Sequence, residues 1–506
     1  MTGTRGRTDR QKGQTGGWAF TEPPRSAQYP LMQEKAPASD RPRRRSEASP
    51  ERASPGHAML DLQRAVGNKA VTALMGAPLD VQRDWTTGQV PVTRPRSNAV
   101  VGDRPSLPPS RPVPAIPPVA VSQQINSGTE RAAGLVALAA LGPAAQALTV
   151  VRLSPEALTD PKVSVALLPI VGTLPKGSGL SDEQKGFLGR VMTQTPATEV
   201  ELLRLTTAVR FDVEVKATAG GGQEWDAPTL KQMYPVLAQL PPSHVESNTS
   251  LDALTRNAAN AGASASGSYN GSTRQGKIGV DTAMLGAANT AADQGDPLRG
   301  VNRFNKVVRH EVGHAVDDAL SWSKGAGPGD AARGGWRRFD DTQAVVRQAL
   351  ADGGSPLAGD AEVIGLAGAQ LVNHVDVVAG MKASPAYAGW SAEKKEKVEA
   401  CPVLPQLKAG FASATPWYKN PAGGPVLGGR VFIESYAGRN WYSYDSAARA
   451  KKVSQYQFRA PGEWFAEAYA TYHEPDPGGV GKLLEPRDAS TKAWLDELHK
   501  NPLPTK

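Results

Sequence analysis

A chain of 506 residues, with 40% hydrophobic and 21% charged side chains, is long enough for two or more folded units. Its single cysteine, Cys401, excludes an intrachain disulfide and a cysteine-based metal site. The net charge of +8 arises entirely within residues 1–120, which carry 18 Lys and Arg against 10 Asp and Glu (18 − 10 = 8); the remainder balances at 57 − 18 = 39 against 49 − 10 = 39.

The first 125 residues have the composition of a disordered arm. Residues 1–120 hold 17 of the 42 prolines together with Arg43-Arg44-Arg45, so they offer little apolar surface to offset the entropy of ordering. A basic arm is typical of proteins that bind nucleic acid or acidic membranes, but the prolines and interspersed acids favour a solvated linker and no nucleic-acid partner. Residues 1–12 lack an apolar segment, so we expect cytoplasmic synthesis without a secretory signal.

One short helix is expected within the arm, over residues 58–75. Its apolar residues recur at three- and four-residue spacing before Gly76: Met59, Leu62, Val66, Ala70 and Ala73. The segment HAMLDLQRAVGNKAVTALMG resembles one near the N-terminus of bacterial proteins associated with phage-tail-like contractile injection systems. This resemblance implies that components of such a system are partners of the arm, and that the protein is exported or injected.

Residues 126–220 predict a helical region without catalytic motifs. Ser181 and Gln184 predict a capping box, and Thr195-Pro196 predicts a second helix start. The apolar stretch 132–151 is about long enough to cross a bilayer, but Gly142-Pro143 interrupts it. Two packed helices and no membrane span are therefore expected. Phe211, Val213 and Val215 alternate as in a strand, and Gly220-Gly221-Gly222 predicts the boundary that follows.

The next region, 225–500, predicts the functional domain. Asp226 is expected to cap a helix that ends near Leu240, and KIGVD, residues 277–281, predicts a short strand. A longer helix follows, whose apolar residues form one stripe: Phe304, Val308, Val312, Ala315 and Ala319. His310 and His314 lie on the opposite face, about 120 to 160 degrees from the centre of the stripe.

The sequence HEVGH, residues 310–314, is an HExxH motif. Histidines four residues apart on a helix are separated by one turn, so both imidazoles reach a single ion. Glu311 then lies beside the ion without ligating it, where its carboxylate accepts a proton from the attacking water. This arrangement predicts one Zn²⁺ per chain, held by His310 and His314.

A third protein ligand is needed, and several residues are candidates. Asp317 suits the orientation of a ligating histidine better than direct ligation, and His374 and His473 are isolated in the sequence. Glu463, in GEWFAEAYATYH, is the favoured candidate, with Glu467 and Asp317 next. Glu463 and Glu467 lie one helical turn apart and repel each other unless a cation or a histidine lies between them.

HEVGHAVDD, EWFAEAY and VSQYQFRAPGEWFAEAYATY together resemble the catalytic domain of anthrax lethal factor and related zinc peptidases of the gluzincin type. The resemblance implies that His310, His314 and Glu463 are the zinc ligands and that Glu311 is the general base. It also implies that Tyr456 lies beside the metal and stabilises the oxyanion.

The interval between His314 and Glu463 is longer than in the compact form of that family. Helices are expected around 342–350 and 362–379, within an insertion spanning about 335–445. The expected fold is α+β and mainly helical: a zincin-like catalytic domain with a small edge sheet and this long insertion, preceded by the disordered arm. Substrate recognition does not carry over from the family, because the insertion could wall the cleft, cover it as a lid, or form its own subdomain.

These observations predict a zinc endopeptidase that acts on protein or peptide substrates, as a toxin or effector delivered by an injection system. One alternative is a catalytically silent zinc-binding structural or cargo protein of such a system, although a structural site needs neither Glu311 nor Tyr456. A second alternative is a nucleic-acid binder acting through the basic arm, whose binding would weaken steeply with salt.

Overall fold

The computed structural model describes residues 116–217, 223–256, 267–278, 285–290, 295–325, 329–372, 376–407, 426–434, 441–501 and 503, which belong to one compact unit, Pro109–Lys506. The expected arm up to position 115, including its helix at 58–75, lies outside the described residues. So do the boundary at 220–222, the end of the strand expected at 277–281, and His374.

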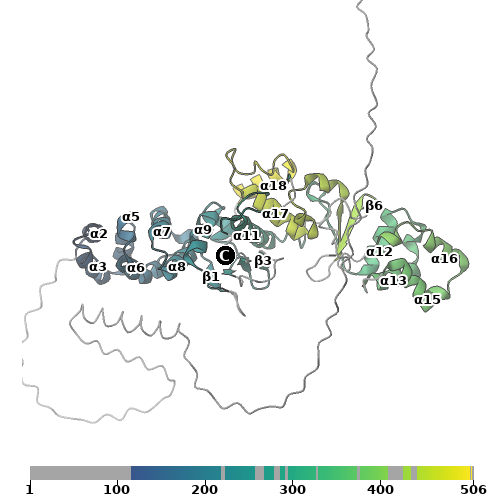
Figure 1. Cartoon of the computed structure of the whole chain (residues 1–506), viewed down its shortest axis with the longest axis horizontal. Helices are drawn as coiled ribbons and strands as arrows, with labels where there is room; N and C mark the ends of the chain where they lie inside the picture. The colour runs from purple at the N-terminus through teal and green to yellow at the C-terminus, as the bar shows by residue number, and fades with distance from the viewer. Residues whose placement is uncertain are drawn as a thin grey trace, which may run out of the picture. The chain divides into compact units, whose positions relative to one another are not determined.

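Apolar side chains of the described residues collect in three cores. Figure 1 labels helices and strands that surround these cores. The first core lies among seven helices: α2 (Pro118–Asn126), α3 (Arg131–Ala140), α4 (Pro143–Val150), α5 (Pro155–Leu158), α6 (Pro161–Thr173), α7 (Asp182–Gln194) and α8 (Val200–Phe211). This region begins earlier than the expected position 126. Pro118 occupies the first turn of α2, where proline is tolerated, and Val121 and Ile125 are fully buried.

Local signals within this region are confirmed in part. Ser181 and Gln184 form the predicted capping box of α7. The helix start predicted at Thr195-Pro196 is wrong: the Thr195 N–H bonds Val191 O and closes α7, and α8 begins only at Val200. The stretch 132–151 forms parts of α3 and α4. In the described part of the chain, no single helix is long and apolar enough to cross a membrane.

The second core surrounds a four-stranded sheet of order β1-β2-β4-β3. Strands β1 (Glu214–Ala217), β2 (Ala253–Arg256) and β4 (Gln275–Ile278) are parallel, and β3 (Gly267–Asn270) is antiparallel to β4 at the edge. Two helices of this core follow β1: α9 (Ala227–Ala238), capped by Asp226 as predicted, and α10 (Pro242–Val245). Helix α11 (Arg303–Leu320) packs against α9, β3, β4 and α17 (Pro461–His473), and α17 contacts α18 (Ala489–Lys500).

The third core belongs to the insertion and contains α12 (Thr342–Asp352), α13 (Ala361–Val372), α14 (Val377–Ala383), α15 (Pro385–Ala388) and α16 (Ala392–Glu399). A second sheet, of order β5-β8-β7-β6, separates this core from the second one. Its strands are antiparallel: β5 (Arg337–Phe339), β6 (Val426–Leu427), β7 (Arg430–Glu434) and β8 (Trp441–Asp445).

Alternate residues of this second sheet face different cores. Val431 and Ile433 of β7 enter the second core, whereas Phe432 between them enters the third. In β8, Tyr444 belongs to the second core and Trp441 to the third. Side chains of a strand alternate between its two faces, so one sheet covers both cores. The described fold is therefore mainly helical with two small sheets, as the α+β prediction requires.

Candidate metal centre

Helix α11 carries the HExxH motif. The Asn302 side chain accepts a hydrogen bond from the Asn305 N–H and caps the helix. Phe304, Val308 and Val312 are fully buried on the predicted apolar stripe. On the opposite face, His310 and Glu311 are buried and His314 is partly exposed. The motif residues therefore face the protein interior rather than open solvent.

Helix α17 supplies the acidic residues. Pro461 occupies its first turn, which places Glu463 near the positive end of the helix, and all its residues except Gly462 are buried. Gly313 of α11 allows the two helices to approach closely: a Cβ atom there would lie 3.1 Å from the Ala466 Cα. The glycine within HEVGH thus helps Glu463 to reach the two histidines.

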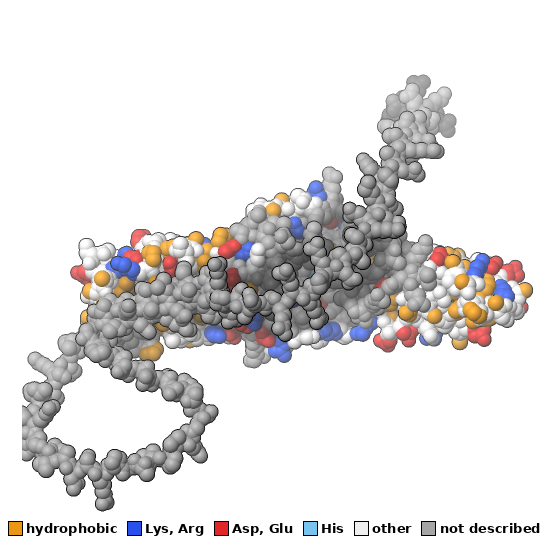
Figure 2. Space-filling model, turned by 60° about the horizontal axis from the view of Figure 1, so that its bottom comes forward, with side chains coloured by type: hydrophobic (Ala, Val, Ile, Leu, Met, Phe, Trp, Pro, Cys, Tyr) orange, Lys and Arg blue, Asp and Glu red, His pale blue; other side chains and the backbone are white. Residues whose placement is uncertain are grey.

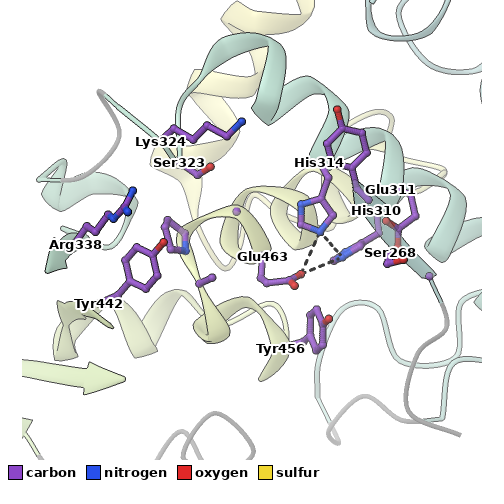
Figure 3. Close-up of a pocket in the computed structure, with 15 residues that line it drawn as sticks. Ser268, His310, Glu311, His314, Ser323, Lys324, Arg338, Tyr442, Tyr456 and Glu463 are labelled. Atoms are coloured by element: carbon purple, nitrogen blue, oxygen red, sulfur yellow. Dashed lines mark hydrogen bonds and ion pairs between the residues drawn. The ribbon is translucent and has the colours of Figure 1, made fainter. Parts of the chain in front are cut away.

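Three donor atoms of these helices converge on one point (Figure 3). Glu463 Oε2 lies 3.2 Å from His310 Nε2 and 3.3 Å from His314 Nε2, and the two Nε2 atoms are 3.1 Å apart. Tetrahedral zinc with bonds of about 2.0 to 2.1 Å would separate its ligand atoms by about 3.3 to 3.4 Å. The spacing fits a metal ion, and unprotonated imidazoles with a carboxylate are a suitable donor set.

The electrostatics of this cluster favour a bound positive charge. Burial would by itself lower the pKa of His310, but contacts with Glu463 and Glu467 raise it to about 9. Burial would raise the pKa of Glu463, yet His314 and His310 hold it well below its usual value. Two buried carboxylates that retain their charge can offset the desolvation of a cation.

Glu467, the runner-up among the predicted ligands, lies on the other side of the His310 ring. Its Oε1 is 2.8 Å from His310 Nδ1, and Lys306 forms an ion pair with the same carboxylate oxygen. The negative charge of Glu467 thus lies against the Nδ1 side of the ring, while Nε2 faces Glu463 and His314. His310 therefore lies between the two acids of α17, the arrangement that their one-turn spacing required.

The carboxylate of Glu311 is almost completely buried beside the three donors. Burial, the largest effect, raises its pKa to about 7. Its Oε2 has no hydrogen-bond partner among the described residues. On β3, a Cβ at Gly267 would lie 2.2 Å from Glu311 Oε1, so any larger residue there would displace the carboxylate from its present position. Sequence inspection did not single out Gly267, because its role depends on the packing of β3 against α11.

Tyr456 begins a short 3₁₀ helix, Tyr456–Arg459, that leads into α17. Its ring centroid lies 5.7 Å from that of His310, and it lines the same pocket. The structure therefore brings Tyr456 near the three donors together with Glu311, the other residue predicted to act on substrate (Figure 3).

The remaining candidates occupy other environments. Both carboxylate oxygens of Asp317 accept hydrogen bonds from Ser323, one from its N–H and one from its hydroxyl. His473 packs in a buried cluster with His244 and Tyr469. Among the described residues, His310, His314 and Glu463 form the group whose donor atoms are close enough to hold a metal.

The pocket has a volume of about 380 Å³. It is lined by β3, α11 and residues 323–324 after it, β5, β8 and the residues around the start of α17, and the lining includes Ser268, Lys324, Arg338 and Tyr442. Lys324, Arg338 and Tyr442 lie outside both motifs, so the motifs could not predict them. No protein-family model, curated protein or solved structure matches the chain.

Proposed function

We propose that the protein is a zinc-dependent endopeptidase that hydrolyses peptide bonds with water as the nucleophile. The observation that carries this proposal is the convergence of His310, His314 and Glu463 to within 3.1 to 3.3 Å of one another, beside the buried carboxylate of Glu311. The α11 and α17 pair with its adjacent edge sheet supports a zincin-like catalytic domain similar to that of lethal factor.

Each residue has a separate role in this reaction. His310, His314 and Glu463 would hold a zinc ion, which would supply Lewis acidity for the scissile carbonyl and lower the pKa of water towards neutrality. Glu311 accepts the proton of the attacking water and returns it to the leaving amine, a role that suits a carboxyl whose pKa burial raises to about 7. Tyr456 donates a hydrogen bond to the carbonyl oxygen as its negative charge develops.

A peptide substrate is supported by the position of β3. This strand is at the edge of its sheet, and Gly267, Ser268 and Tyr269 line the pocket next to Glu311. An extended peptide pairs with an exposed strand edge through main-chain hydrogen bonds, which require no particular sequence. Such pairing would bring a peptide bond alongside Glu311 and the three ligands.

The proposal is tested by comparing full-length wild type with Glu311→Gln. We expect about one zinc per chain in both proteins, from elemental analysis, and cleavage of a degenerate peptide library by wild type alone, from mass spectrometry. Glu463→Ala should lose the zinc. Equal cleavage by wild type and Glu311→Gln would remove Glu311 from the mechanism, whereas stoichiometric zinc without any cleavage would favour the silent scaffold.

Delivery by a contractile injection system is a separate proposal that rests on residues 57–76. Deleting 57–76 should prevent loading of the chain into an injection particle of the producing cell and leave peptide cleavage unchanged. Loading of the deleted chain at the level of the full-length chain would contradict it.

Across the face shown in Figure 2, Lys and Arg are interspersed with Asp and Glu in the described parts of the chain, an arrangement that gives nucleic acid no continuous basic surface there.

A further inference from the structure

The pocket has a wall that neither motif predicts. Arg338 of β5, Tyr442 of β8 and Lys324, which follows α11, line it. Figure 3 shows Arg338 and Tyr442 on the side of Glu463 opposite Ser268 and Glu311. The insertion therefore contributes directly to the surface on which a substrate would lie.

The strand register determines which side of the sheet Arg338 occupies. Arg338 pairs with Tyr442, and Phe339 pairs with Trp441. Phe339 packs against the third core and stacks on Phe432, so Arg338 projects from the opposite face. Tyr442 shares this face and packs against the second core. Arg337 projects away from the pocket, on the face of Phe339.

Arg338 supplies the positive charge of this wall. Its side chain is exposed, and no ion pair joins it to a carboxylate within the described ranges. Lys324 is also well exposed, but it forms an ion pair with Asp318. A negatively charged substrate group that reaches this wall is thus attracted to Arg338.

We propose that Arg338, assisted by Lys324, binds a carboxylate of the peptide substrate and makes the enzyme selective for acidic peptides. This proposal rests on the proposed peptidase function and names its substrate class. A guanidinium binds a carboxylate through two parallel hydrogen bonds, which fixes orientation as well as charge. The carboxylate belongs either to an Asp or Glu side chain or to the C-terminus of the peptide, and both present the same group.

The test measures cleavage and binding separately. Cleavage is measured for zinc-loaded wild type, Arg338→Gln and Arg338→Glu. The substrate is a peptide from the library screen in four versions, with Glu or Gln at the position nearest the wall and with a free or an amidated C-terminus. Binding of the same peptides to Glu311→Gln, with and without Arg338→Gln, is measured by fluorescence anisotropy; if the screen yields no substrate, an Ala-rich peptide scanned with Glu replaces it. Arg337→Gln is the matched control, because it removes the same charge from the adjacent position on the opposite face.

We expect wild type to prefer the carboxylate peptide about fivefold or more in kcat/KM and in affinity, Arg338→Gln to lose this preference, and Arg337→Gln to keep it. Arg338→Glu should reverse the preference and favour the peptide that lacks the carboxylate. Loss of preference on Gln substitution identifies the side chain as the carboxylate source, and loss on amidation identifies the C-terminus. Cleavage without any carboxylate preference overturns this inference but not the peptidase function. Arg338-dependent binding without cleavage overturns the peptidase function but not the carboxylate subsite, and the absence of both overturns both.

Discussion

Glu467 Oε1 lies 2.8 Å from His310 Nδ1, while His310 Nε2 lies 3.2 Å from Glu463 Oε2. The same imidazole thus contacts one acid of α17 with each of its nitrogens. The negative charge of Glu467 therefore lies against the Nδ1 side of the ring, and Lys306 forms an ion pair with the same Glu467 oxygen.

Glu467→Gln should therefore weaken zinc binding by about tenfold without abolishing it, because an amide oxygen still faces Nδ1 but the carboxylate charge is lost. Competition with a chelator of known affinity measures the change. Glu497→Gln, which alters an exposed acid of α18, should bind zinc as wild type does. An unchanged zinc affinity in Glu467→Gln would show that the contact does not orient His310.

Gly313→Ala tests the close approach of α11 and α17. The added Cβ would lie 3.1 Å from the Ala466 Cα, a backbone atom that cannot rotate away. We expect destabilisation of about 1 to 3 kcal/mol in denaturant unfolding, together with weaker zinc binding as the helices separate. Gly365→Ala is the matched control: nothing lies within 4 Å of its Cβ in α13, so alanine should instead stabilise by about 0.5 to 1 kcal/mol.

Tyr456→Phe should reduce kcat by about a hundredfold or more and leave the zinc content unchanged, because it removes only the proposed hydrogen bond to the developing oxyanion. Steady-state kinetics on the best library peptide provide the measurement. Tyr387→Phe, in the third core, should retain full kcat. A Tyr456→Phe variant as active as wild type would assign oxyanion stabilisation to another group.

His244 predicts a pH dependence of stability. Burial, reinforced by the charge of His499, lowers its pKa from 6.5 to about 3, and its Nδ1 contacts the Tyr469 hydroxyl at 2.9 Å. The unfolded chain takes up a proton near pH 6.5, but the folded chain does so only near pH 3. The free energy of unfolding should therefore fall as pH drops through this window, by up to about 1.4 kcal/mol per pH unit from this residue.

Denaturant unfolding of metal-free wild type and His244→Gln between pH 7 and pH 4 isolates this contribution. The variant should show a shallower decline, since it lacks the proton uptake of His244 on unfolding. The slopes are compared rather than the absolute stabilities, because the substitution also changes the contact with Tyr469. Parallel slopes would show that His244 is not kept neutral by the fold.

The sequence predicted best what depends on local spacing. The four-residue spacing predicted that His310 and His314 share one face of α11, and that Glu463 and Glu467 share one face of α17. The capping box predicted at Ser181 is also present. What the sequence could not predict depends on packing between distant segments. Gly267 lies over Glu311, and Arg338 reaches the pocket, only because elements far apart in the chain pack together.

The boundary errors have a similar origin. Pro117-Pro118 has the composition of a linker, yet α2 begins there because Val121 and Ile125 are buried against neighbouring helices. Thr195-Pro196 has the features of a helix start, but Thr195 is already bonded to the end of α7. Tertiary burial overrides such local preferences, and no pattern within a few residues reveals it.

The sheet between the second and third cores makes the insertion inseparable from the rest of the protein. Deleting it would remove Val431, Ile433 and Tyr444 from the second core, which also contains the apolar side of α11, and would expose that core's apolar surface to solvent. A shortened chain is thus expected to aggregate rather than to survive as a minimal enzyme. In any homologue without this segment, other side chains must cover the same apolar surface.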